Sequence, residues 1–314
     1  MKKIFFSLLF LILAGFFLHL LVQFLPPYFS RTAKESFILA KKTSDQALAV
    51  RLEEGGFVRS RTAFEQALKI KNLQGKIQPG GYYLSKNMSV FEIIEVLSSG
   101  PIQRWVTLPE GLRKEETADI LGENLGWDSE QRQLFLDNSK EGYLFPETYL
   151  LDVDWSGGDI AKRLSGQFDK EFKVLSEGYD DGLSRDELVV LASLVQRESR
   201  GAEEMSMVSG IIFNRLNMGM KLDIDSTLQY QTGSPENWWP KVSAGVKSME
   251  SLYNTYLNKG LPPSPICSPG EEALVASMFP KKNSYLYYLH DAEGEAHYAE
   301  TYEDHLRNIE KYLK

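Results

Sequence analysis

A long apolar run near the N-terminus constrains this chain more than any other feature. After Met1, Lys2 and Lys3, residues 4–25 read IFFSLLFLILAGFFLHLLVQFL and contain no Asp, Glu, Lys or Arg. At about 1.5 Å rise per residue, a helix of that length spans the roughly 30 Å hydrocarbon core of a bilayer. The run exceeds the apolar part of a cleavable signal peptide and lacks the small residues of a cleavage site. We therefore expect residues 1–30 to form a cytoplasmic tip, a retained transmembrane anchor and a juxtamembrane turn, rather than a buried core helix.

The charges that flank this run predict its orientation. Lys2 and Lys3 precede it, and positive charges tend to stay in the cytoplasm. Everything from Pro26 onward is then expected on the extracytoplasmic side of a single-pass membrane protein.

The composition of the remaining chain excludes several classes of protein. The 314 residues are 43% hydrophobic, which is enough for packed cores, and 35 basic against 43 acidic residues give a net charge of −8. Because residues 1–30 hold two lysines and no acids, the rest is more acidic still, and no nucleic-acid partner is expected. Cys267 is the single cysteine, so disulfides and cysteine-rich metal sites are excluded. Its Pro-rich surroundings favour a packed, inert thiol.

Turn and capping signals divide the exported part into two units, which together predict an α+β fold. Residues 31–105 read as a small module of helices and strands, in which a helix begins after Ser44 and another follows the Ser89–Glu92 capping box. Tyr82 and Tyr83 fit either sheet packing or sugar stacking. Residues 106–314 form a mainly helical second unit with some strands.

One carboxylate in the second unit lies on the apolar face of its helix. Residues 184–199 begin with a Ser184–Glu187 capping box and carry an apolar stripe of 3.6-residue period. At 100° per residue, Glu198 lies about 20° from Leu191 on that stripe. Burial disfavours the charged form of a carboxyl group, so Glu198 could act as a general acid if the helix end opens into a cleft. The alternative is a structural glutamate paired with an arginine.

The segment that follows Glu198 is expected to be a helix and then a strand. A helix through Leu216 stops at Gly219, and residues 220–225 alternate between apolar and polar side chains. In such a strand Asp223 and Asp225 would point to the same side, either into solvent or into a substrate groove.

Seven ordered segments resemble the YceG-like (MltG) endolytic murein transglycosylases over roughly residues 40–312. They are GGYYLSKNMSVFEIIEVLSSG, VTLPEGLRKEETADIL, GYLFPETY, LASLVQRES, IIFNRLNMGMKLDIDSTLQY, YNTYLNKGLPPSPICSPG and YLYYLHDAEGEAHYAETYEDHL.

The resemblance implies a single-pass enzyme of the bacterial inner (cytoplasmic) membrane, with a LysM-like module in residues 31–105 and a catalytic domain in residues 106–314 on the periplasmic side. Its substrate would be nascent, uncrosslinked peptidoglycan glycan strands, and its reaction would terminate their elongation. Glu198 matches the family's catalytic glutamate. It would protonate the MurNAc–GlcNAc glycosidic oxygen and then help the C6 hydroxyl of MurNAc attack C1, leaving a 1,6-anhydroMurNAc end. No metal or cofactor is required. Peptidoglycan synthases and divisome or elongasome proteins are candidate partners.

Several further residues are candidates for substrate binding; the alternative is a helix cap for Asn214 and Arg215, a solvated face for Asp225 and Thr227, and core packing for Tyr230 and residues 253–256. They are Ser199, Asn214, Arg215, Asp225, Thr227, Tyr230, Tyr253, Asn254, Thr255 and Tyr256. The chain departs from the family pattern where Ser226 replaces a usual proline and Gln196 a frequent glutamate. Trp238 and Trp239 lie in a loop with no clear counterpart, for which a structural role is favoured over sugar binding.

Two other functions fit the same residues. A muramidase would hydrolyse the same bond, with Glu198 as acid and Asp223 or Asp225 activating water. A membrane-tethered glycan-binding or divisome scaffold would be catalytically silent. His290, His297 and His305 lack carboxylates at metal-ligand spacing, so no metal site is expected.

Overall fold

The computed structural model describes residues 2–180 and 182–313, and the chain divides into two compact units. The first comprises Met1–Val106 and Tyr149–Asp154, and the second comprises Thr107–Thr148 and Trp155–Lys314. Helices and strands occur in both, which confirms the α+β class. No helix within the described residues combines the length and the apolar content that crossing a membrane requires. The expected anchor therefore stays a prediction.

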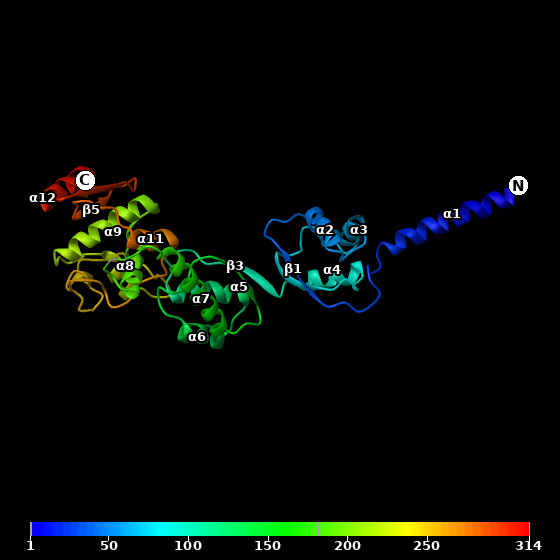
Figure 1. Ribbon diagram of the computed structural model, residues 1–314, viewed down its shortest axis with the longest axis horizontal. Coiled ribbons are helices and arrows are strands. Elements are labelled where there is room, and N and C mark those ends of the chain that lie inside the picture. Colours follow the sequence, from blue (N-terminus) through cyan, green and yellow to red (C-terminus); the bar gives the residue numbers. More distant parts are fainter. Residues whose placement is uncertain (1, 181, 314) are drawn as a thin grey trace. The chain divides into compact units, whose positions relative to one another are not determined.

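The first unit contains a four-stranded sheet in the order β1-β2-β3-β4. Its elements are α1 (Lys2–Val22), β1 (Glu35–Leu39), α2 (Asp45–Glu54), α3 (Arg61–Ile70), β2 (Gly80–Leu84), α4 (Val90–Ser98), β3 (Gln103–Thr107) and β4 (Thr148–Asp152). Strands β1 and β2 are antiparallel, with Phe37 opposite Tyr82. Helices α2 and α3 lie side by side, and α4 lies beside β2 (Figure 1).

Local sequence signals explain where these elements begin. The Ser44 hydroxyl accepts the Ala47 N–H at the start of α2, and the expected Ser89–Glu92 capping box opens α4. Tyr82 is buried in the core of this unit and donates its hydroxyl to the Gln78 carbonyl, whereas Tyr83 is exposed. Tyr82 thus has the packing role, and Tyr83 stays open to either interpretation.

The second unit is mainly helical. Its elements are α5 (Lys114–Leu125), α6 (Ser129–Asn138), α7 (Gly157–Leu175), α8 (Arg185–Glu198), α9 (Gly201–Asn217), α10 (Asp225–Thr232), the 3-10 turn η1 (Val246–Ser248), α11 (Glu271–Met278), the antiparallel hairpin β5 (Tyr287–His290) and β6 (Ala296–Ala299), and α12 (Tyr302–Tyr312).

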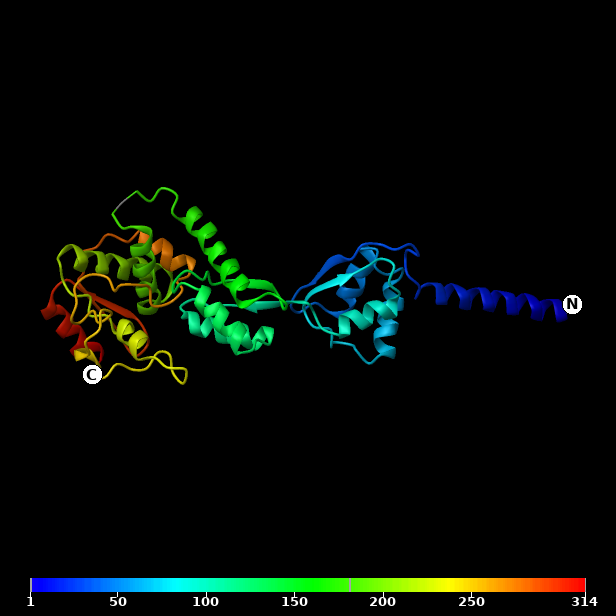
Figure 2. The ribbon, with the colours of Figure 1, turned by 90° about the horizontal axis from the view of Figure 1, so that it is seen from below.

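The core of the second unit surrounds α8. Residues 188–195 of this helix are all buried, and α11 packs against both α8 and α9 (Figure 2). Cys267 belongs to this core and is completely buried, and burial raises the pKa of its thiol well above the usual value. The thiol is therefore packed and protonated, as expected. Because the core fixes α8 on every side, it also fixes the position of the residue with which the helix ends.

Candidate active site

Glu198 is the last residue of α8, and two hydroxyl groups hold its carboxyl group. The expected Ser184–Glu187 capping box starts the helix, and the extended backbone of Ser199 ends it. Ser226 Oγ donates to Glu198 Oε1 at 2.7 Å, and Tyr288 Oη donates to Glu198 Oε2 at 2.9 Å. Ser226 lies in the first turn of α10 and Tyr288 on β5, so three elements meet at this carboxyl group.

Both of these partners are neutral. Burial and the adjacent Glu198 carboxylate raise the pKa of the Tyr288 phenol well above its usual value, so it stays protonated. Within the described chain, no cation lies within ion-pair distance of Glu198, and the structural alternative of an arginine pair does not hold. A hydroxyl group can donate to a carboxylate or accept from a carboxylic acid. The two contacts therefore suit Glu198 both with and without its proton.

The segment between α9 and α10 is not the strand that its alternating pattern predicts. Only Lys221 forms a bridge, with Lys259; Asp223 has a left-handed backbone (φ 52°), and Asp225 already belongs to α10. Thr255 explains the difference, because its hydroxyl accepts the Ile224 N–H at 2.9 Å and removes it from strand pairing. The prediction that Asp223 and Asp225 share one face of a strand is therefore wrong.

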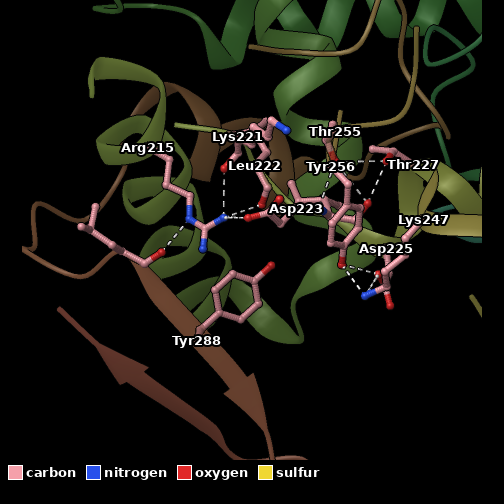
Figure 3. Close-up of polar contacts among 12 residues, drawn as sticks. Arg215, Lys221, Leu222, Asp223, Asp225, Thr227, Lys247, Thr255, Tyr256 and Tyr288 are labelled. Carbon is pink, nitrogen blue, oxygen red and sulfur yellow. Dashed lines mark hydrogen bonds and ion pairs between the residues drawn. The ribbon is translucent and has the colours of Figure 1, made fainter. Parts of the chain in front are cut away.

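Asn214 and Arg215 tie α9 to the surrounding loops. Arg215 is buried and donates to the carbonyls of Leu222 at 2.7 Å and Leu286 at 2.6 Å, and it pairs with Asp223 at 3.3 Å (Figure 3). Asn214 donates to the Tyr285 carbonyl at 2.9 Å. Their polar atoms are thus committed to the segments that carry Ser226 and Tyr288, which favours positioning over substrate contact.

Asp225 forms a compact charged cluster with Lys247 and Tyr256. Lys247 Nζ lies 3.2 Å from Asp225 Oδ1, and Tyr256 Oη donates to the same oxygen at 2.5 Å (Figure 3). Burial, Asp225 and, to a smaller extent, Glu198 raise the pKa of the Tyr256 phenol. Tyr256 therefore lies within electrostatic range of both carboxylates, and Asp225 has a cationic partner that Glu198 lacks.

Four other predicted binding residues are buried and bonded to the backbone. The Ser199 hydroxyl donates to the Val195 carbonyl at 3.0 Å, and the Thr227 hydroxyl to the Ile224 carbonyl at 2.7 Å. Asn254 donates to the Met249 carbonyl at 2.7 Å, and Thr255 holds Ile224 as described. These side chains shape the loops around Glu198.

Tyr230 and Tyr253 pack together, with ring centroids 5.3 Å apart. The Arg113 guanidinium lies 4.2 Å from the Tyr230 ring and 4.8 Å from that of Trp238. Arg197 covers the Trp239 ring at 3.7 Å. An arginine therefore packs on each tryptophan, which favours a structural role over sugar binding. The same two arginines cover one face of the Tyr230 ring and one face of the Trp239 ring.

Sequence reasoning missed three residues of this region. Ser226 was noticed only as a departure from the family pattern, and Tyr288 lies in a quoted segment without being singled out. Glu141 is buried, accepts the Lys114 N–H and the Tyr230 hydroxyl, and has a pKa raised to about 7 by burial. No local pattern indicated that this glutamate would be buried.

Comparison with known proteins assigns the chain to a family. A sequence model of the YceG-like family matches residues 37–311. The chain belongs to the YceG-like family. A Bacillus subtilis (strain 168) relative named endolytic murein transglycosylase is 29% identical over 86% of this chain and 82% of its own length. A Streptococcus pneumoniae (strain R6) relative of the same name is 27% identical over 85% of this chain, which spans 56% of that longer protein. The crystal structure of a yceG-like protein from Listeria monocytogenes has a TM-score of 0.59 at 22% identity, covering 88% of this chain and 98% of that one, and supports the fold.

Proposed function

We propose that this chain is an endolytic lytic transglycosylase that cleaves the MurNAc–GlcNAc bond of nascent peptidoglycan strands and leaves 1,6-anhydroMurNAc ends. The names of the curated relatives support the activity class. One observation supports Glu198 as the acid–base residue. It is held by two neutral hydroxyls, whereas Asp223 and Asp225 are each paired with a cation.

The chemistry follows from that difference. A carboxyl group bonded to neutral hydroxyls can carry a proton, donate it to the glycosidic oxygen and then accept one from the C6 hydroxyl of MurNAc. Asp223 and Asp225 are instead paired with Arg215 and Lys247, so neither presents a free carboxyl group for this role. One residue then performs both proton transfers, and water is not consumed.

We also propose that residues 1–30 anchor the protein in the inner membrane, with the rest of the chain on its outer side, and that residues 31–105 form a LysM-like module. The apolar sequence of residues 4–25 supports the anchor. The LysM-like module is supported by the order of elements along the chain, in which α2 and α3 connect the paired antiparallel strands β1 and β2. Synthase and divisome partners stay expectations from the resemblance.

Mass spectrometry of the glycan fragments released from uncrosslinked peptidoglycan tests the activity. The wild-type chain should give ends lighter by one water than hydrolysed ends, and Glu198→Gln should give none while keeping its fold. Glu177→Gln, at an exposed position after α7, is the matched control and should cleave normally. Full-mass reducing ends would indicate a muramidase, and glycan binding without products would indicate a scaffold.

A further inference from the structure

A charged cavity of about 640 Å³ lies beside the end of α8, between the first turn of α9 and the β5–β6 hairpin. Its charged and aromatic lining comprises Arg200, Glu203, Glu204, Lys281, Glu295 and Tyr298. These residues have no role in the proton transfers proposed for Glu198. A cavity of this volume lies within the range of pockets that take small molecules or a few amino acids.

Both glutamates in the first turn of α9 are already paired, Glu203 with Lys281 of the cavity wall and Glu204 with the ring of His290. Lys281 Nζ lies 3.3 Å from Glu203 Oε1, and the His290 ring lies 2.7 Å from Glu204 Oε1. Arg200 and Glu295 differ, since neither side chain has a hydrogen-bond or ion-pair partner among residues 2–180 and 182–313. The cavity therefore presents one unpaired cation and one unpaired anion.

The Arg200 guanidinium lies close to the hairpin turn. Gly294 has a left-handed backbone (φ 84°), and a Cβ atom there would lie 2.6 Å from Arg200 Nη1. Because Gly294 has no side chain, the guanidinium can approach the turn closely. Arg200 thus lies at the wall of the cavity with its charge unpaired.

The cavity also lies close to Glu198. Arg200 follows Glu198 by two residues, so their Cα atoms are at most about 7 Å apart. On the other wall, His290 and Tyr288 lie on the same side of β5 with ring centroids 6.0 Å apart. Tyr288 is hydrogen-bonded to Glu198 and His290 to Glu204, so strand β5 contacts both the catalytic carboxyl group and a residue of the cavity wall.

We propose that this cavity binds the peptide carried by the MurNAc residue whose bond is cleaved. This inference depends on the proposed function and names a further part of its substrate. Muramyl peptides leave the sugar at C3, two carbons from the C1 atom that reacts, and they carry both carboxylate and amino groups. Arg200 would bind a peptide carboxylate, and Glu295 a peptide amino group. Peptide binding then sets the sugar's C1 against Glu198 and makes peptide-bearing strands the preferred substrate.

The test compares kcat/KM of the full chain on uncrosslinked peptide-bearing strands with that on the same strands after an amidase has removed their peptides. The wild-type protein should prefer the peptide-bearing strands at least tenfold. Arg200→Glu should reduce that ratio about tenfold or more, which is the effect of losing one charge-assisted hydrogen bond. Glu295→Gln should reduce it several-fold. Both positions are at the surface, so both variants should fold.

Lys162→Glu is the matched control, because it makes the same charge change at an exposed position of α7 outside the cavity. It should keep the wild-type ratio. Equal wild-type activity on both substrates, or an unchanged ratio in Arg200→Glu, would overturn the peptide site while leaving the transglycosylase activity in place. Cleavage of neither substrate by the wild-type protein would overturn the proposed function and this inference with it.

Discussion

Replacing Tyr288 by phenylalanine tests whether the hydroxyl contacts of Glu198 matter for catalysis. The substitution removes the donor that lies 2.9 Å from Glu198 Oε2 and keeps the ring that packs against the core of the second unit. A hydrogen bond to a charged group contributes about 1.5–3 kcal/mol. Because Glu198 is half-buried, water can replace part of this contact, so we expect the lower value. At 1.4 kcal/mol for each factor of ten, kcat should fall about tenfold.

Product release from uncrosslinked strands, followed by chromatography, measures this effect. The loss should lie in kcat rather than in KM, since the hydroxyl stabilises the carboxylate that forms when Glu198 has donated its proton. The free energy of unfolding should fall by about 1–1.5 kcal/mol, because the same hydrogen bond is present in the resting enzyme.

Tyr287→Phe is the matched control for this experiment. It makes the same change one residue earlier on β5, where the side chain points to the other face of the strand and contacts His305. This variant should keep normal kcat. Ser226→Ala should resemble Tyr288→Phe, and the double variant should lose more than either single one. Full kcat in Tyr288→Phe, or an equal loss in Tyr287→Phe, would refute the role given to the Tyr288 hydroxyl.

Three further predictions concern stability. Burial raises the pKa of the Glu141 carboxyl group from 4.5 to about 7. The protonated group therefore stabilises the folded state fully below pH 4.5, and this stabilisation is lost as the pH rises through 7. In denaturant unfolding, the free energy of unfolding should fall by about 3 kcal/mol between these pH values, and this fall should be absent in Glu141→Gln. Arg215→Lys should cost about 2–4 kcal/mol, measured in the same way, because lysine cannot reach the carbonyls of two segments with one planar group. Gly142→Ala should lower Tm strongly, because φ is 84° and the new Cβ would lie 2.4 Å from a Pro265 carbon, whereas Gly166→Ala in α7 should raise it slightly. Equal Tm shifts in the two alanine variants would contradict the argument.

The sequence predicted the helix that carries Glu198 because its signals are local. A capping box, an apolar stripe and a polar residue at its end all lie within residues 184–199, and each follows from helix geometry. The same holds for the helices after Ser44 and Ser89.

The remaining site depends on contacts between distant residues. The strand expected over residues 220–225 fails because Thr255, far along the chain, binds the Ile224 N–H. Tyr288 is separated from Glu198 by 90 residues, and no periodicity connects them. Asn214 and Arg215 were candidates for substrate binding or for a helix cap, and only the fold shows that backbone carbonyls accept their hydrogen bonds. Spacing therefore located the acid but not the groups that orient it.

The strand β4 makes the first unit discontinuous in sequence, which affects both truncated fragments and the nascent chain during synthesis. The chain leaves this unit after Val106 and returns only for Tyr149–Asp154, where β4 completes the sheet. A fragment that ends near residue 106 would lack β4 and leave the backbone groups of β3 unpaired at a sheet edge. During synthesis the nascent chain carries the same unpaired edge until residues 149–154 emerge, and in that interval β3 is open to pairing with other chains.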